Sequence, residues 1–168
     1  MTAQTVRKLW PFGWVREIPR ECGRYLTRWS VREQKPTGGG GWRVYLHRFW
    51  ANDLELHDHP WHWSFSLILW GSYTEIYFDK PADKSNPLDE SERWTTAELE
   101  AFQTKRRRVR WFNWIPSTRF HQIEELHGNV WTIFVCGPVH GKSWGFWVPG
   151  RGRIKHKQRK AERGVPVQ

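Results

Sequence analysis

Short runs of apolar and β-branched residues, separated by glycine, proline and polar clusters, make up most of this chain. Within these runs the hydrophobic positions repeat more nearly every two residues than every 3.6, which is the spacing of strands. The only helical repeat is weak and lies at residues 90–102, where a strand is an equally good interpretation. Strands are predicted at residues 24–31, 42–50, 63–71, 72–79, 108–115, 119–126, 129–137 and 143–150.

The segments between these strands carry turn signals. "PTGGGG" at 36–41 predicts a hairpin tip, "HGN" at 127–129 a tight turn between two strands, and residues 79–91 a polar loop. Many short strands joined in this way indicate an all-β, antiparallel sandwich or barrel in a single domain. We expect a barrel at 24–150, an N-terminal extension packing on its outside at 1–23, and a tail at 151–168.

The composition agrees with one aromatic-rich domain. The chain has 168 residues, of which 14 are tryptophan and 9 phenylalanine, so aromatic side chains must dominate its interior. Its two cysteines, Cys22 and Cys136, have neither the number nor the spacing of a disulfide framework or a thiolate zinc site. The sequence shows no signal-peptide pattern and no apolar run near the roughly 20 residues that a membrane span needs. We therefore expect a soluble, cytoplasmic protein without a membrane partner.

Positive charge is concentrated at the C-terminal end. The formal net charge is +10, and residues 151–168 contribute +6 of it, from seven Lys or Arg against Glu162 alone. Like charges with few apolar residues are typical of a mobile, solvated tail. The alternative is a tail that contacts phosphate groups, either of a nucleic acid or of another anionic partner.

Three histidines stand out in "LHDHPWHWS", residues 56–64. His57 and His59 are two positions apart, so in an extended chain both imidazoles lie on the same side and can share one ion. Pro60 ends that strand because it cannot donate to a ladder. The best remote candidate for a third ligand is His121, which follows a proline turn in another predicted strand.

The spacing around these histidines resembles the cupin superfamily. In its first motif a glycine is followed after five residues by His-x-His, then after three or four by a glutamate, and after six more by a glycine. His57 and His59 occupy the histidine positions, Ser64 the glutamate position and Gly71 the final glycine. In the second motif, Pro116 and His121 match the proline and the histidine.

The chain also departs from the cupin motifs. Ala51 and Arg110 replace the opening glycines, Thr118 the turn glycine, and Glu125 the closing asparagine. Ser64 replaces the carboxylate ligand, so the histidines are kept while the glutamate is lost. A neutral three-histidine set leaves the charge of a bound ion available to an anion, to water or to dioxygen.

The resemblance implies a double-stranded β-helix, the cupin jelly-roll barrel, with a divalent transition metal on His57, His59 and His121. A three-histidine motif is similar to that of the thiol dioxygenases, which favours Fe(II); Zn, Mn or Ni are the alternatives. The implied activity is dioxygenase-like or sugar or sugar-phosphate isomerase-like. The chain also resembles small cupin proteins of bacteria and phages. A non-catalytic binding or structural module remains the alternative. In either case a homodimer is compatible with the sequence.

Further residues are candidates for the surroundings of the metal. An additional ligand or a supporting partner is expected among His62, Ser64, Glu75 and His47. Arg119 lies two residues before His121, hence on the same side of the predicted strand, where its guanidinium would orient a small anionic substrate. The other substrate-binding candidates are Trp61, Trp63, Tyr73 and Gln122.

Overall fold

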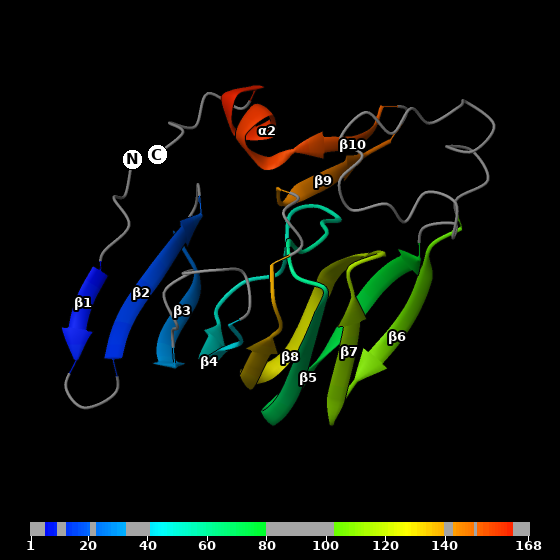
Figure 1. The fold of residues 1–168 in the computed structure, drawn as a ribbon. Coiled ribbons are helices and arrows are strands. Elements are labelled where there is room, and N and C mark those ends of the chain that lie inside the picture. The colour runs from blue at the N-terminus through cyan, green and yellow to red at the C-terminus, as the bar shows by residue number, and fades with distance from the viewer. Residues whose placement is uncertain are drawn as a thin grey trace.

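The fold is almost entirely antiparallel β-structure (Figure 1). The computed structural model describes residues 6–9, 13–20, 23–32, 41–79, 103–139, 143–149 and 151–162. Their strands are β1 (Val6–Leu9), β2 (Gly13–Arg20), β3 (Gly23–Arg32), β4 (Arg43–Phe49), β5 (Trp63–Asp79), β6 (Lys105–Val109), β7 (Phe112–Pro116), β8 (Arg119–Cys136), β9 (Gly145–Val148) and β10 (Gly152–Lys155). One helix, α2 (His156–Glu162), follows. The predicted all-β, antiparallel class is confirmed.

The two longest strands, β5 and β8, pair along nearly their whole length and bend together. Gly71 of β5 and Gly128 of β8 have φ angles of 72° and 79°, a conformation that favours glycine. A Cβ on Gly71 would stand 2.7 Å from the backbone oxygen of Asn129. These glycines let one continuous ribbon turn a corner, so that its two halves belong to two different sheets.

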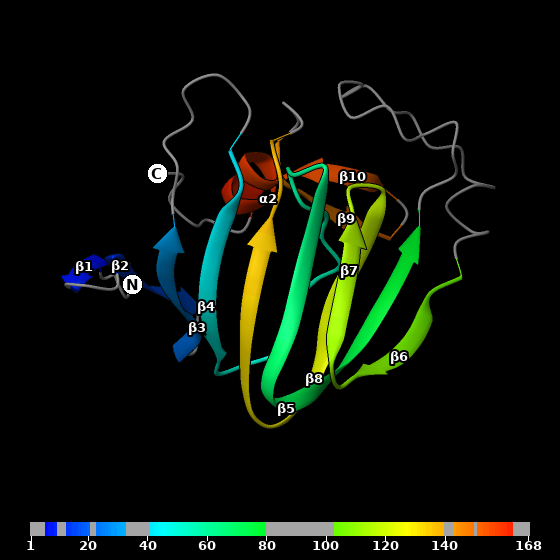
Figure 2. The same cartoon turned by 60° about the horizontal axis from the view of Figure 1, so that its bottom comes forward.

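The first sheet contains the N-terminal half of β5 and the C-terminal half of β8. Its strands follow the order β1-β2-β3-β4-β8-β5, and β7 pairs with the N-terminal half of β5. The second sheet contains the other halves of β5 and β8, with β6 on one side. On its other side His57 bridges His121 and Phe146, which connects β8 to the β9–β10 hairpin. Figure 2 shows the strands β3 to β8 curving beneath the β9–β10 hairpin and α2.

The core lies on the inward faces of these strands and is rich in aromatic residues, as expected. One cluster, beside the corner, contains Ile68, Tyr73, Val109, Ile123 and Val130. A second contains Tyr45, Ile115, Phe134 and Cys136. A third, of Phe78, Phe120 and Trp147, joins β5 and β8 to β9. Burying rings of this size supplies most of the driving force for folding.

Three predicted boundaries were wrong. Residues 63–71 and 72–79 form one strand, as do 119–126 and 129–137, because the chain bends at Gly71 and Gly128 without leaving the ladder. The "HGN" segment is therefore a bend within β8 and not a hairpin turn. Residues 108–115 divide into β6 and β7, which pair with different halves of β5.

The two ends of the chain are more structured than the sequence suggested. β1 and β2 continue the first sheet from β3. Within the predicted tail, residues 152–155 pair with β9 and residues 156–162 form α2, so a loose tail is not observed there. The predictions for 36–40, 80–102 and 163–168 lie outside the described residues. Among those described, no helix has the length and apolar character that crossing a membrane requires.

Candidate metal centre

His57, His59 and His121 come together because the backbone pairs His57 with His121. The His57 N–H donates to the His121 carbonyl and the His121 N–H to the His57 carbonyl, both at 2.9 Å. The 56–58 segment thus lies between β8 and β9, and His59 follows it. Two motif halves that are 62 residues apart in the chain thereby meet at one point.

One ligand nitrogen from each imidazole lies within 4.8 Å of those of the other two. The Nε2 atoms of His59 and His121 are 2.8 Å apart. The Nδ1–H of His57 donates to the carbonyl oxygen of Glu55 at 3.1 Å, which leaves its Nε2 as the free acceptor. His57 and His121 are buried. These are the features expected of imidazoles prepared for one divalent ion.

Glu75 bonds the imidazole of His121 on the side that faces away from His59. Its Oε1 accepts the Nδ1–H of His121 at 2.9 Å and an amide hydrogen of Asn113 at 2.7 Å. Its Oε2 accepts from Nε of Arg107 at 2.8 Å. Arg107 also donates to the amide oxygen of Asn113. Glu75 therefore orients His121 through its Nδ1, which leaves Nε2 facing His59.

Electrostatics favour an ionised Glu75 and a neutral His57. Burial by itself raises the pKa of the Glu75 carboxyl, but the hydrogen bond and charge of His121, the hydrogen bond from Asn113 and the charge of Arg107 outweigh it and bring the pKa to about 2. Burial also lowers the pKa of His57 from its ordinary value. A neutral imidazole keeps the lone pair that a metal ligand needs.

Aromatic rings surround the cluster. The Trp61 ring stacks on His59 at a centroid distance of 5.3 Å, and Trp144 approaches His57 at 5.6 Å. Phe134 lies 5.7 Å from His59. The predicted role of Trp61 beside the site is thus compatible with its position. These rings limit water and give the site an apolar wall.

The expected additional ligands lie in different surroundings. Ser64 is fully buried, and its Oγ has no hydrogen-bond partner among the described residues. His62 is exposed, and its backbone N–H donates to the Pro138 carbonyl. His47 is buried on β4, where its Nε2 accepts from Nε of Arg28 at 2.9 Å. None of these three belongs to the group of converging ligand nitrogens found in the described part of the chain.

The substrate-binding candidates other than Trp61 have partners outside the histidine cluster. Arg119 makes a two-pronged ion pair with Asp79, at 2.8 and 3.0 Å. Gln122 donates to the Asp53 carbonyl, and Trp63 stacks on Trp114. Tyr73 is buried and its hydroxyl accepts from Asn113. None of the contacts recorded for the described residues joins Arg119, Gln122 or Trp63 to the histidines.

Sequence reasoning missed three supporting residues. Asn113 and Arg107 brace Glu75, and the buried Asp58 accepts from the Gly145 N–H at 2.8 Å and from Nε of Arg153 at 2.9 Å. Asp58 thus fixes the segment between the two motif histidines to β9 and β10. Its position within "HDH" was a signal that could have identified it. Arg107 and Asn113 carried no such signal. Their partner, Glu75, lies on β5, and only the pairing of strands brings it to them.

Comparison with known proteins yields structural likenesses only. No family model and no curated protein matches the chain. A cupin-like protein from Thermotoga maritima aligns over 87% of this chain and 88% of its own, at 12% identity and a TM-score of 0.42. The polyketide cyclase RemF from Streptomyces resistomycificus aligns over 84% and 80%, at 11% identity and a TM-score of 0.44.

Oxalate decarboxylase from Bacillus subtilis aligns over 97% of this chain at 14% identity and a TM-score of 0.43, but the chain spans only 35% of that protein. Likenesses this distant carry no information on activity. The class follows instead from the chain itself: an antiparallel strand ribbon that turns a corner, with His57, His59 and His121 meeting where the 56–58 segment pairs with β8. This is an antiparallel β-barrel protein with a candidate metal centre.

Proposed function

We propose that the protein is a metal-dependent enzyme acting on a small molecule, with one divalent transition ion held by His57, His59 and His121. The observation that carries this proposal is the convergence of three imidazole nitrogens within 4.8 Å. Two hydrogen bonds support it: His121 Nδ1–H donates to Glu75, and His57 Nδ1–H donates to the Glu55 carbonyl. Such outer partners are typical of ligating histidines.

Fe(II) is the favoured ion and Zn, Mn or Ni the alternatives, because imidazole suits several transition metals and no carboxylate joins the ligand set among the described residues. When bound, the ion would supply a Lewis acid for an anionic oxygen or a site for dioxygen. The chain's own residues would orient the ligand and exclude water. The proposed activity is dioxygenase-like or isomerase-like, on a small anionic ligand.

The aromatic walls support a ligand with an apolar or planar part beside its anionic group. Trp61 and Trp144 flank His59, at centroid distances of 5.3 and 6.2 Å. The ion would bind the anionic end while these rings contact the remainder. Arg119 is paired with Asp79, so this proposal assigns it no contact with the ligand.

Metal analysis of protein purified without a metal-affinity tag tests the proposal. We expect about one equivalent of transition metal per chain, either as purified or after adding Fe(II), Mn, Ni or Zn. His121→Ala should lose most of this binding, whereas His62→Ala, which changes an exposed histidine outside the cluster, should keep it. Failure of the unaltered protein to bind any of the four metals would refute the proposal.

A binding role for the basic tail has weaker support. Arg153 is paired with Asp58, Arg159 with Glu55, and Arg151 with Glu162. These arginines hold α2 and β10 in place, so much of their charge is compensated within the molecule.

A further inference from the structure

Exposed cationic and aromatic side chains follow one another along β6 and β7. We call this the Arg–Trp edge; its exposed members are Lys105, Arg106, Arg108, Arg110, Trp111, Phe112 and Trp114. Among the described strands, β6 and β7 each pair with β5 alone, so both lie at a sheet edge. The edge is separate from the histidine cluster, and the proposed enzyme does not use it.

Positive charge along this edge is only partly compensated. Arg106 pairs with Glu124. Arg108 donates to the hydroxyl of Ser72 at 3.1 Å, a neutral partner. Arg110 is exposed and makes no ion pair recorded for the described residues. Unlike the arginines of the C-terminal segment, Arg108 and Arg110 thus keep their charge available to a partner.

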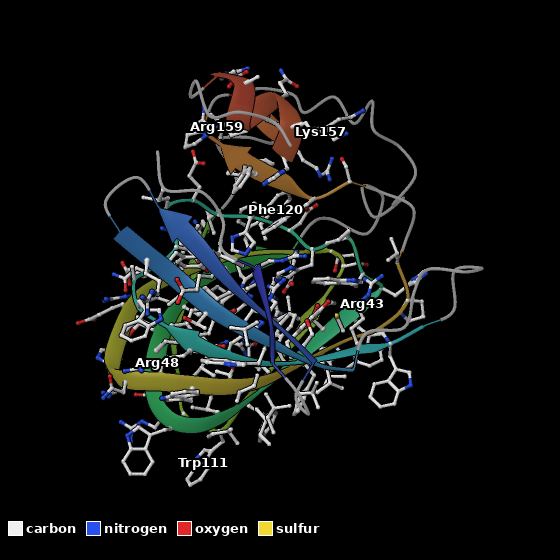
Figure 3. All side chains as sticks on the ribbon, turned by 90° about the vertical axis from the view of Figure 1, so that its left-hand side faces the viewer. Arg43, Arg48, Trp111, Phe120, Lys157 and Arg159 are labelled. Carbon is white, nitrogen blue, oxygen red and sulfur yellow. The ribbon has the colours of Figure 1, made fainter. Side chains whose placement is uncertain are left out.

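The rings of the edge are unusually exposed for their size. Trp111 is 77% exposed, Phe112 65% and Trp114 49%. Trp70 of β5, 70% exposed, lies close by, since the Ile68 N–H donates to the Trp111 carbonyl at 2.8 Å. Figure 3 shows Trp111 projecting outward at the end of the molecule opposite α2. Large rings left in water in one place mark an interaction surface.

Two of these rings are held in fixed orientations. Phe112 stacks on Phe65 at a centroid distance of 6.1 Å, and Trp114 stacks on Trp63 at 5.3 Å. Each pair is supported from one side and remains accessible from another. Supported rings lose little conformational freedom when a planar group stacks on them.

We propose that the Arg–Trp edge binds single-stranded nucleic acid, with phosphates on Arg108 and Arg110 and bases stacked on Trp111 and Phe112. Cations on β6 and in the following bend, continued by rings in that bend and on β7, provide the combination that unpaired nucleic acid requires. Arginine outnumbers lysine here, and its planar guanidinium both forks onto phosphate and stacks on bases. A paired duplex would not offer its base faces to these rings.

Charge also distinguishes this partner from a second copy of the chain. A twofold contact through the edge would place Arg108 and Arg110 of one copy near those of the other. Like charges at such a contact oppose association, whereas a phosphate backbone is attracted to them. An anionic membrane surface shares this attraction, so vesicle binding must be measured alongside.

Fluorescence anisotropy of the full-length protein with labelled oligonucleotides of about 15 nucleotides, made of deoxythymidine or of uridine, tests the proposal at low salt. We expect binding that weakens with salt. Arg110→Ala should reduce the salt slope by about 0.7, the contribution of one single-strand phosphate contact. Trp111→Ala should weaken binding by about fivefold to a hundredfold, through loss of one stacked base.

Lys157→Ala is the matched charge control, because it removes one exposed cation from α2, far from Trp111 (Figure 3). Trp42→Ala is the matched ring control, since Trp42 is 42% exposed at the start of β4. Both controls should bind like the unaltered protein. Circular dichroism verifies that each variant is folded.

Three results would overturn the proposal. The first is no binding of either oligonucleotide by the unaltered protein. The second is an equal loss in Arg110→Ala and Lys157→Ala, which would mean a general effect of net charge. The third is binding to vesicles of phosphatidylglycerol and phosphatidylcholine that depends on Trp111, without oligonucleotide binding, which would assign the edge to a membrane surface.

Discussion

At the scale of single residues, the carboxylate of Glu75 links the interior of the barrel to the histidine cluster. It is fully buried and accepts hydrogen bonds from His121, Asn113 and Arg107. A buried carboxylate is costly unless its partners compensate for lost hydration, and here three donors do so. The same contacts decide which nitrogen of His121 faces the proposed ion.

Glu75→Gln should therefore weaken metal binding. The amide is uncharged, so it no longer favours the Nδ1–H form of His121, and partners of this kind contribute about 10- to 100-fold to metal affinity. Competition with a chelator of known affinity measures the change. Glu124→Gln is the matched control, because Glu124 pairs with Arg106 outside the site. An unchanged affinity in Glu75→Gln would argue against its orienting role.

His47 predicts a pH dependence of stability that is independent of the metal. It is buried and accepts a hydrogen bond from Arg28, and burial together with the Arg28 charge lowers its pKa well below 6.5. Below pH 6.5, His47 is protonated in the unfolded chain but stays neutral in the folded chain. Stability is therefore lost as the pH falls from about 6.5, by up to about 1.4 kcal/mol per pH unit.

Chemical unfolding of the metal-free protein between pH 7 and pH 5 measures this dependence. His47→Gln should reduce it, since glutamine keeps an acceptor and does not titrate, while the buried His57, whose pKa is also lowered, keeps part of the dependence. His62→Gln, at an exposed position, should leave it unchanged. A slope in His47→Gln as steep as that of the unaltered protein would assign the pH dependence to other groups.

At the scale of elements, the β5–β8 ribbon determines the architecture, because both sheets depend on its corner. The corner positions Gly71 and Gly128 both have positive φ but differ in available space. A Cβ on Gly128 would meet no atom within 4 Å, whereas one on Gly71 would meet the Asn129 carbonyl oxygen at 2.7 Å. A substitution at Gly128 therefore tests backbone strain alone, whereas one at Gly71 tests backbone strain together with a steric clash.

Gly71→Ala should destabilise the protein more than Gly128→Ala. Both replacements incur the strain of a left-handed residue, about 1–2 kcal/mol. At Gly71 the backbone of β8 must also move, which adds a cost of about 1–3 kcal/mol. Thermal unfolding of the two variants measures the difference. Equal losses would mean that the corner adapts without disturbing the ladder.

Strand locations between β3 and β9 were largely predictable, since apolar residues recur about every second position in most of these strands. β6, with the sequence KRRRV, lacks this pattern. Strand continuity was not predictable. From the local sequence, Gly71 and Gly128 predict turns that would end their strands. In the structure β5 and β8 remain paired on both sides of the bend, so the ladder continues. β10 was missed because its residues Gly152–Lys155 show little apolar pattern, and its pairing with β9 supplies the stabilisation instead.

At the scale of the whole molecule, the proposed ion would connect the segment before β5 to β8 and so stabilise the folded chain as a unit. A ligand that binds only the folded state stabilises it by about 2.7 kcal/mol at a hundredfold excess over its dissociation constant. Adding the preferred metal should thus raise the melting temperature by several degrees. His57→Ala should abolish this rise, whereas His62→Ala should preserve it.

Differential scanning calorimetry with and without the metal measures this effect. The comparison is made on the rise that metal causes within each variant, so a variant with lower intrinsic stability remains informative. A rise of equal size in His57→Ala would place metal binding elsewhere in the molecule.

By itself, the sequence determined the antiparallel class, the aromatic core and the histidines as candidate ligands, because periodicity and motif spacing are local properties. Tertiary structure alone decided that His57 pairs with His121, that Glu75 orients His121 and that Arg119 binds Asp79. Each of these contacts joins residues far apart in the chain. Strand register sets them, and register depends on the corner at Gly71 and on the packing of both sheets, which no local pattern encodes.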